Sequence, residues 1–481
     1  MRFDVEKKLF LEENVGADKI AFAAADRSLR WQELEALSGK ICEVFKQLNI
    51  PAGYPVLVYG EKEALFLASV LSCYRMNLPF VPLTPSLPKK RIEKIIEQTK
   101  SRVLINCGNY ENTGEQCVII SPDLRVTGNA QTWENCMEGT AYVLFTSGSS
   151  GEPKGVKITY DNVIAFIKWF VQYLRIDRET VFINQADFSF DISLADLFGT
   201  LHTGGTAVFN TYQISAETSS LFERINKYGG SYWNSTPSFV MRCLADKNFN
   251  AQTLPSVTRF VLSGEDLPVQ LVKDLQTRFP KVAVVNAYGP TETTIYAGFA
   301  EITTGMLREN SLPICKEENA IISLRDDEIV ISGNTVGAGY LNNEALTKEK
   351  FFWEGSKKSY RSGDRGVAKN GYIYFNGRKD GQIKFNGYRI ELNEIKHALE
   401  KIDNIFHAEC IPVVIDNKIK RLIAFITCKS EKINISYVLL QLKTELPPYM
   451  IPSEIVVLKE FPTTTSFKVD KQKLLSDYLS E

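Results

Sequence analysis

Apolar residues recur along the first 300 positions in two different rhythms. Residues 64–76 (ALFLASVLSCYRM) and 89–99 (KKRIEKIIEQT) place them at helical spacing, whereas residues 79–83 (PFVPL) and 101–107 (SRVLINC) are short apolar runs typical of buried strands. The same alternation returns between residues 206 and 289. It predicts an α/β fold with a largely parallel sheet, in which a large N-terminal domain is built from layered α/β subdomains.

The pattern changes well before the C-terminus. Short strands broken by glycine, as in EIVISGNTVGAGY (328–340) and NGYIYFNG (370–377), predict a small β-rich subdomain. The charged stretch GRKDGQIKFNG (377–387) has the composition of a hinge, although a plain β-turn would look the same. Helix and strand patterns then alternate again and predict a small α+β domain. We therefore expect two domains, residues 1–379 and a mobile domain formed by residues 380–481.

Composition and charge exclude several classes of protein. The chain has 481 residues, 44% hydrophobic and 23% charged, which is typical of a folded globular protein and not of a disordered one. Its 56 basic and 57 acidic residues leave a net charge of -1, so no global field attracts nucleic acid. The start of the chain has no continuous apolar run, so we expect neither a secretion signal nor membrane insertion, and we predict a cytoplasmic location.

The cysteines and histidines indicate no metal site. Nine cysteines are scattered along the chain without a C-x-x-C pair, which predicts reduced thiols and no disulfide framework. The three histidines are not at metal-ligand spacing, so we interpret them as ordinary core or surface residues.

A loop rich in glycine and hydroxyl groups follows a predicted strand in residues 142–155 (YVLFTSGSSGEPKG). Glycines let the backbone approach a ligand closely, hydroxyls add neutral donors, and a lysine adds positive charge. This combination indicates a phosphate-binding loop, although the spacing is not that of a Walker loop. A surface linker is the alternative, but linkers seldom follow a strand directly and end in Pro-Lys-Gly. The residues concerned are Thr146, Ser147, Gly148, Ser149, Ser150, Gly151, Lys154 and Gly155.

Four further motifs follow this loop along the chain. They are NAYGPTETT (286–294), EIVISGNTVGAGYLN (328–342), YRSGDRG (360–366) and GRKDGQIKFNGYRIEL (377–392). Over nearly the whole chain, the ordered set resembles the motifs of the adenylate-forming superfamily, which includes acyl-CoA synthetases, luciferases and amino-acid adenylation domains. The resemblance implies that the protein uses ATP and Mg²⁺ to join AMP to a carboxylate. Because this reaction brings two anions together, the site must neutralise charge and align the reactants.

The resemblance also implies roles for the residues of a nucleotide site. Glu292 would bind Mg²⁺, Tyr288 would stack on the adenine and Asp364 would accept hydrogen bonds from both ribose hydroxyls. Arg378 would lie near the ribose and phosphates. Asp364 by itself has the alternative of capping a turn. The implied nucleotide-binding set is Thr146, Ser147, Gly148, Ser149, Ser150, Gly151, Lys154, Asn286, Ala287, Tyr288, Gly289, Thr291, Asp364, Arg378 and Lys468.

The segment FPTTTSFKVDKQKL (461–474) resembles the catalytic-lysine motif of the family. It implies that Lys468 bridges the carboxylate and the α-phosphate, with Thr146 and Glu292 as the other catalytic residues. Without the resemblance, this lysine would be a solvated surface charge. Ser466-Phe467 precedes it, where the family usually has Asn-Gly.

The resemblance further implies that the C-terminal domain rotates between two half-reactions. Asp380 would be the hinge. The rotation would withdraw Lys468 and bring residues 387–391 (GYRIE) to the site, where Gly387 would line a channel for a thiol.

The stretch FSFDISLADLFGTL indicates the carboxylate that is activated. Asp191 matches the aspartate with which amino-acid-activating members pair the α-ammonium group of the substrate. Asp187 and Asp196 are nearby alternatives that we interpret as solvated or capping residues. The implied pocket contains no second charge, which favours a small or modest neutral amino acid. Its members are Asp191, Ile192, Ala195, Asn234, Val261, Ser263, Ala287, Ile295 and Tyr296.

The sequence therefore predicts a ligase that forms an aminoacyl-AMP from ATP, releases pyrophosphate and passes the aminoacyl group to the phosphopantetheine thiol of a separate carrier protein. Within the superfamily, the chain most resembles D-alanine ligases that load a carrier protein and the adenylation domains of nonribosomal peptide synthetases. Those D-alanine ligases commonly carry a cysteine at the position of Ser263. The alternatives are an acyl- or aryl-CoA synthetase, which would not need Asp191, and a non-catalytic adenylate-binding protein.

Overall fold

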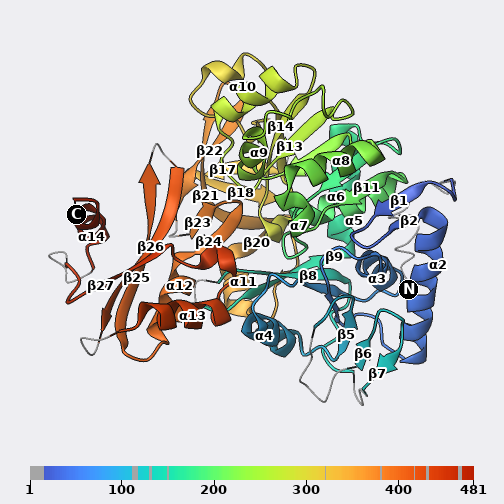
Figure 1. Ribbon diagram of the computed structural model, residues 1–481, viewed down its shortest axis with the longest axis horizontal. Helices are drawn as coiled ribbons and strands as arrows, with labels where there is room; N and C mark the ends of the chain where they lie inside the picture. Colours follow the sequence, from blue (N-terminus) through green and yellow to red (C-terminus); the bar gives the residue numbers. More distant parts are fainter. Residues whose placement is uncertain are drawn as a thin grey trace. The chain divides into compact units, whose positions relative to one another are not determined.

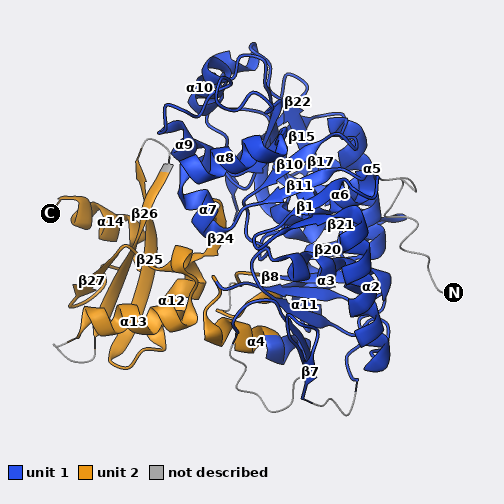
Figure 2. Ribbon diagram, turned by 45° about the vertical axis from the view of Figure 1, so that its right-hand side comes forward, with its two compact units in different colours: residues 1–85, 96–145, 155–379 blue, residues 86–95, 146–154, 380–481 orange. Residues whose placement is uncertain are grey.

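The computed structural model divides the chain into two compact units, which Figure 2 colours separately. Unit 1 comprises residues 1–85, 96–145 and 155–379, and unit 2 comprises residues 86–95, 146–154 and 380–481. The structure describes residues 16–110, 118–128, 133–148, 151–319, 321–379, 382–415, 418–428, 433–463 and 469–480. Within them the α/β fold class is confirmed.

The first sheet of unit 1 has eight strands in the order β15-β14-β13-β12-β10-β11-β1-β2. Its six inner strands are parallel, as expected where helices connect successive strands. Helices α8, α9 and α10 share a hydrophobic core with β12, β13 and β14 (Figure 1). The strands are β1 (Ile20–Ala23), β2 (Ser28–Arg30), β10 (Val181–Asn184), β11 (Thr206–Phe209), β12 (Tyr232–Ser235), β13 (Arg259–Leu262), β14 (Ala283–Tyr288) and β15 (Gly298–Glu301). The helices are α5 (Tyr160–Leu174), α6 (Ile192–Thr203), α7 (Tyr212–Ala216), α8 (Thr218–Tyr228), α9 (Pro237–Leu244) and α10 (Val269–Arg278).

A second eight-stranded sheet has the order β19-β9-β8-β4-β3-β5-β6-β7. The predicted helices at 64–76 and 89–99 are α3 (Ala64–Arg75) and α4 (Lys89–Thr99), and the predicted strands between and after them are β4 (Phe80–Leu83) and β5 (Val103–Asn106). These predictions are confirmed. The remaining elements are α2 (Trp31–Gln47), β3 (Val56–Tyr59), β6 (Val118–Ile120), β7 (Val126–Thr127), β8 (Thr140–Thr146), β9 (Lys154–Thr159) and β19 (Gly339–Tyr340).

Unit 1 also contains the β-rich part that the glycine-punctuated segments predict. Its sheet has the order β16-β22-β21-β18-β17, and β20 pairs with β21. The elements are β16 (Cys315–Lys316), β17 (Ile322–Arg325), β18 (Glu328–Ser332), α11 (Glu344–Lys350), β20 (Phe351–Glu354), β21 (Lys357–Lys369) and β22 (Tyr372–Arg378). Among the described residues, 3₁₀ turns occur at η1 (Thr291–Thr293), η2 (Met306–Arg308) and η3 (Pro448–Met450).

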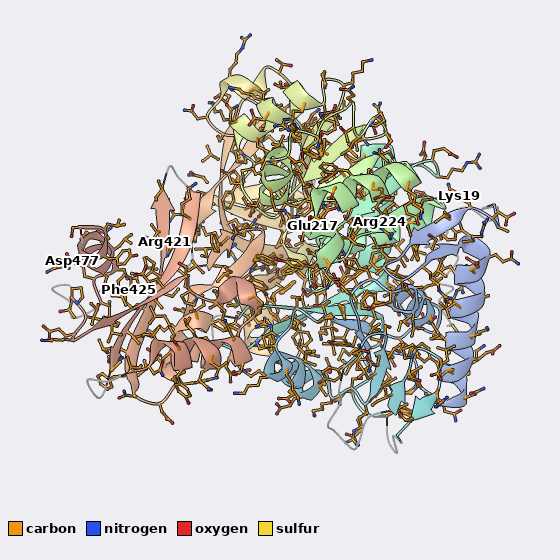
Figure 3. All side chains as sticks on the ribbon, in the orientation of Figure 1. Lys19, Glu217, Arg224, Arg421, Phe425 and Asp477 are labelled. Carbon is orange, nitrogen blue, oxygen red and sulfur yellow. The ribbon has the colours of Figure 1, made fainter. Side chains whose placement is uncertain are left out.

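Unit 2 has its own hydrophobic core, which is formed by a β-hairpin, a three-stranded sheet and helices. Helix α14 is held to β26 by Tyr478, whose ring meets Phe425 edge-on at 5.9 Å and lies under the guanidinium of Arg421. Figure 3 labels Phe425 and Arg421 on β26 and Asp477 on α14. The elements are β23 (Gln382–Phe385), β24 (Tyr388–Glu391), α12 (Leu392–Glu400), β25 (Ile405–Ile415), β26 (Lys418–Cys428), α13 (Ile435–Glu445), β27 (Glu454–Leu458) and α14 (Lys471–Ser480). Among the described helices of both units, none is long and apolar enough to cross a bilayer.

Candidate functional site

A buried carboxylate connects the end of β14 to the small sheet of unit 1. The hydroxyl of Tyr288 donates to Oδ2 of Asp364 at 2.6 Å, and Arg378 forms an ion pair with the other oxygen. Asp364 and Arg378 are register partners on β21 and β22, which brings their side chains together. The Asp364 side chain is only 3% exposed. Two donors therefore fix the orientation of a carboxylate that retains lone pairs for a ligand.

Tyr288 stays protonated in this arrangement. Burial, together with the negative charge of Asp364 and the hydrogen bond to it, raises the pKa of the Tyr288 hydroxyl well above its ordinary value. The structure thus gives Tyr288 a hydrogen-bonding role that the sequence did not predict. Stacking of its ring on adenine stays a prediction.

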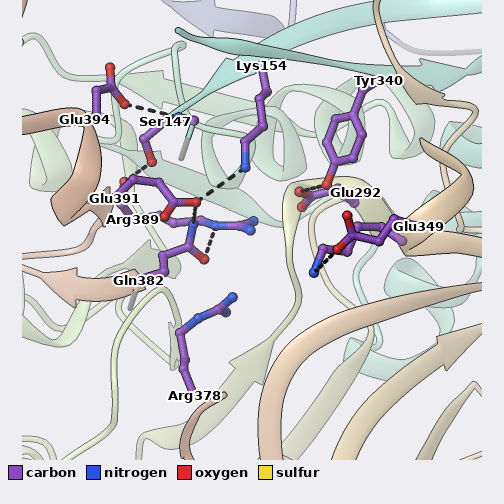
Figure 4. A network of polar contacts seen from close by, with 12 residues as sticks. Ser147, Lys154, Glu292, Tyr340, Glu349, Arg378, Gln382, Arg389, Glu391 and Glu394 are labelled. Atoms are coloured by element: carbon purple, nitrogen blue, oxygen red, sulfur yellow. Dashed lines mark hydrogen bonds and ion pairs between the residues drawn. The ribbon is translucent and has the colours of Figure 1, made fainter. Parts of the chain in front are cut away.

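Glu292 lies in η1, directly after the strand that carries Tyr288. Its side chain is fully buried, and Oε1 accepts a hydrogen bond from the Tyr340 hydroxyl at 2.8 Å (Figure 4). The hydroxyl of Tyr360 lies 3.4 Å from that of Tyr340. A buried carboxylate oriented by a hydroxyl matches the way in which Mg²⁺ is usually bound in nucleotide sites, by one or two carboxylates together with substrate phosphates.

The turn after β14 depends on Gly289. A side chain at this position would meet the carbonyl oxygen of Ile295 and would lie 2.7 Å from Cα of Tyr296. The chain then passes through positive φ values of 62° at Thr294 and 71° at Ile295. Only glycine therefore fits the close approach of the backbone in the turn that leads from β14 to Glu292.

Several of the residues predicted for the amino-acid pocket lie near the carboxyl ends of parallel strands in unit 1, the edge at which ligands bind in open α/β sheets. Asn234, Val261 and Val285 are neighbours across β12, β13 and β14. Of the nine predicted pocket residues, Asp191 is half-buried and the other eight are buried. The buried residues are Ile192, Ala195, Asn234, Val261, Ser263, Ala287, Ile295 and Tyr296.

Asp191 is the residue that precedes α6. Burial raises the pKa of the Tyr142 and Tyr296 hydroxyls. The negative charge of Asp191 raises both pKa values further, so the Asp191 carboxylate interacts electrostatically with both phenols. An ammonium group would complement this charge.

Asp196 corrects an interpretation based on the sequence. We expected a solvated or capping residue, but its side chain is 1% exposed and accepts hydrogen bonds from Asn184 at 2.8 Å and Asn234 at 2.9 Å. Every residue of α6 is buried, from Ile192 to Thr203. The run ISLADLFGTL is apolar on nearly all sides, and this signal could have predicted a buried helix and hence a buried carboxyl group.

The predicted phosphate loop belongs to unit 2, where three of its residues contact α12 or the strand before it. The Ser147 hydroxyl donates to the carbonyl of Arg389 at 2.9 Å, the Gly148 N–H to Oε2 of Glu394 at 3.1 Å, and Lys154 lies 3.4 Å from Glu391 (Figure 4). The sequence did not predict these contacts.

Thr146 ends β8 at the start of this loop. Its hydroxyl is buried and makes no hydrogen bond within the part of the chain that the structure describes. An unsatisfied buried hydroxyl beside backbone N–H groups fits a loop that binds phosphate. Ser149, Ser150, Asp380 and Lys468 lie outside the described residues.

Gly387 is described and lies in the turn between β23 and β24. It follows Asn386, and the two residues have φ values of 51° and 85°. Two positive φ values at Asn-Gly are typical of a two-residue hairpin turn. This turn explains the glycine locally, and its predicted role in a thiol channel stays a prediction.

The family model for AMP-binding enzymes matches residues 11–341, and the chain belongs to this family. The prediction of an adenylate-forming ligase is confirmed.

Two relatives carry the name D-alanine–D-alanyl carrier protein ligase. The one from Bacillus licheniformis is 35% identical over 482 residues, 95% of this chain and 96% of the relative. One from Bacillus cereus is 32% identical and covers 96% of each chain.

Solved structures show the same fold. The Vibrio cholerae adenylation domain AlmE, in complex with glycyl-adenosine-5′-phosphate, has a TM-score of 0.85 at 20% identity and covers 100% of this chain and 98% of its own. Holo-PA1221, a nonribosomal peptide synthetase protein with adenylation and carrier domains, has a TM-score of 0.78 at 22% identity and covers 95% and 81%.

Proposed function

We propose that the protein activates a small neutral amino acid with ATP and transfers it to the phosphopantetheine thiol of a separate carrier protein. The observation that carries this proposal is the pair of oriented, buried carboxylates Asp364 and Glu292 at the end of β14, in a chain of the AMP-binding family. The name D-alanine–D-alanyl carrier protein ligase, which the Bacillus relatives carry, supports an amino acid as the acyl donor and a carrier protein as the acyl acceptor.

In the first half-reaction, an oxygen of the substrate carboxylate attacks the α-phosphorus of ATP and pyrophosphate leaves. Asp364 would accept hydrogen bonds from the ribose hydroxyls, and Arg378 would offset its charge near the phosphates. Glu292 would hold Mg²⁺, which offsets the charge of the phosphates when bound. Lys468 would neutralise the developing charge between carboxylate and phosphate.

Asp191 would orient the amino acid. Its carboxylate pairs with the α-ammonium group, which leaves the substrate carboxylate directed toward the nucleotide. A simple fatty or aryl acid has no ammonium group with which the Asp191 carboxylate could form this ion pair. The buried, mainly apolar residues around it favour a small, uncharged side chain.

In the second half-reaction, the thiol sulfur attacks the acyl carbon, a thioester forms and AMP leaves. We propose that the domain formed by residues 380–481 alternates about Asp380 between the two steps. Gly387 would then line the path of the pantetheine arm, and a cytoplasmic location would supply both ATP and the carrier protein.

Exchange of labelled pyrophosphate into ATP, measured with the twenty amino acids, D-alanine and simple acids, tests this proposal. We expect exchange that depends on one or a few small neutral amino acids. Exchange driven by simple carboxylic acids alone would favour a CoA synthetase. Binding of nucleotide without any exchange would favour a non-catalytic protein. Either of these results would contradict the proposal.

A further inference from the structure

Two residues of the predicted amino-acid pocket, Asn234 and Tyr296, belong to one buried chain of hydrogen bonds in unit 1. Asp196 on α6 is at its centre. Its Oδ2 accepts from the Asn184 amide at 2.8 Å and its Oδ1 from the Asn234 amide at 2.9 Å. Because Asn184 and Asn234 are register partners on β10 and β12, one carboxyl group bridges two adjacent strands.

The branch through Asn234 leads into the pocket. The amide nitrogen of Asn234 also donates to the carbonyl of Ile192 at 3.2 Å, and its Oδ1 accepts from the Tyr296 hydroxyl at 2.8 Å. Both hydrogens of the amide therefore meet acceptors. A flipped amide would turn its oxygen toward the Ile192 carbonyl, which can only accept, so this carbonyl together with the Asp196 carboxyl group fixes the orientation of Asn234.

This orientation determines what Tyr296 offers to a ligand. A phenol has one hydrogen, and Tyr296 donates it to Asn234. Burial keeps the phenol protonated by raising its pKa, although hydrogen bonds with Ser263 and Asn234 oppose the rise. Toward Ser263 and the pocket, the Tyr296 oxygen therefore presents only lone pairs.

We infer that Asp196 is a positioning residue for the amino-acid substrate: through Asn234 it holds the Tyr296 hydroxyl as a hydrogen-bond acceptor in the pocket wall. Such a wall accepts apolar or hydrogen-bond-donating side chains, because a carboxylate or carbonyl oxygen placed there would be buried against lone pairs. This assignment of specificity rests on the proposed function. The arrangement of Asp196, Asn234 and Tyr296 does not.

The branch through Asn184 supplies a matched control. Asn184 bonds to the same carboxyl group, but its other amide contact is with the carbonyl of Ser193 on α6 and not with Tyr296. If Asp196 had only a structural role, loss of its hydrogen bond with Asn184 and loss of its hydrogen bond with Asn234 would have the same effect on stability and on KM for the amino acid. A positioning role predicts that only the Asn234 branch affects the substrate.

The first experiment measures KM for the amino acid and for ATP in pyrophosphate exchange. Asp196→Asn replaces an acceptor with a donor toward one of the two asparagines, and we expect about a tenfold rise in KM for the amino acid with KM for ATP nearly unchanged. Asn184→Ala should lower stability and leave KM for the amino acid unchanged.

An unchanged KM in Asp196→Asn or an equal rise in KM in Asn184→Ala would overturn the inference. A second measurement does not require activity. In a thermodynamic cycle of Asp196→Asn and Tyr296→Phe, followed by unfolding of the full chain, we expect non-additivity of about fivefold in the unfolding equilibrium constant. Additive effects would overturn the positioning role, whereas coupling in a protein without amino-acid-dependent exchange would contradict the proposed function alone.

Discussion

We propose that the selection of an amino acid over other carboxylic acids depends on Asp191. Its half-buried carboxylate acts on the Tyr142 and Tyr296 phenols, and no hydrogen bond from its side chain caps α6. We expect Asp191→Ala to reduce amino-acid-dependent exchange by roughly 100-fold, because the substrate ammonium would lose its charged partner in a partly desolvated site.

The control for this prediction is Asp161→Asn. Asp161 is an exposed carboxylate in the first turn of α5 and should not affect exchange. Retained preference for amino acids over simple acids in Asp191→Ala would show that another group reads the ammonium.

Asp196 gives the folded state a characteristic pH dependence. Burial raises its pKa from 3.8 to about 8, although Asn184, Asn234 and Lys62 oppose the rise. Between these two values the folded state binds the proton more tightly than the unfolded state, so this group makes stability fall as pH rises from about 4 to about 8. Unfolding free energies measured at pH 5 and pH 8 should show a smaller decrease in Asp196→Asn than in the wild type. An identical decrease would contradict the shifted pKa.

At the residue scale, two buried carboxylates lie in recognisable sequence motifs and were predicted as site residues, whereas the burial of a third depends on packing alone and was missed. Asp364 and Glu292 stand in recognisable motifs, and the structure buries both beside tyrosines. Asp196 has no motif of its own. Its environment depends on Asn184 and Asn234, which come together only when β10 and β12 pair.

The turn that follows β14 is the element on which the orientation of Glu292 depends. Gly289→Ala would place a methyl group against the backbone of Ile295 and Tyr296, and the turn would have to shift. We expect a loss of about 1–3 kcal/mol in the free energy of unfolding and at least a tenfold loss of exchange activity.

Gly305→Ala is the matched control, because the nearest atom to an added methyl group there lies 3.9 Å away, on Thr303. It should change the free energy of unfolding by less than about 0.5 kcal/mol. Equal effects of the two substitutions, measured by denaturant unfolding and exchange, would contradict the role of the turn.

Helices with regularly spaced apolar residues were predictable from the sequence, whereas the short segments that connect elements were not. The helices α3 and α4 follow directly from their apolar spacing. The stretch SYWNSTP (231–237) contains the strand β12, and α9 begins at Pro237, immediately after Thr236. The Thr236 hydroxyl accepts from the N–H of Phe239, and proline is favoured in a first helical turn, so a helix start was encoded there.

At the scale of the whole molecule, unit 2 is assembled from segments that are far apart in sequence. Arg91 on α4 donates to Glu394 on α12 at 2.6 Å, and the two are 303 positions apart. Both side chains are nearly buried, with 4% and 3% exposed. We expect Arg91→Met to lower the free energy of unfolding by roughly 3–5 kcal/mol, because it leaves the Glu394 carboxylate buried without its cation.

The double variant R91M/E394L should recover much of this loss, since it removes both charges. Lys348→Met, which breaks an exposed pair with Glu344, should change the free energy of unfolding by less than about 1 kcal/mol. Denaturant unfolding of the full chain checks all three, and a small effect of Arg91→Met would contradict the importance of the buried pair.

Contacts between segments that are distant in sequence are the features that could not be predicted. The motif Thr146 to Lys154 indicates phosphate binding by its composition, but its contacts with Arg389, Glu391 and Glu394 arise from the packing of distant segments. No local pattern encodes that packing. The roles of Lys468 and Asp380, which lie outside the described residues, rest on the family resemblance.

A crystal structure of the full chain with Mg²⁺ and a non-hydrolysable ATP analogue is the most direct measurement. We expect the ribose hydroxyls to lie within hydrogen-bond distance of Asp364 and the metal to be bound by the carboxylate of Glu292. A nucleotide bound away from these two carboxylates would contradict it.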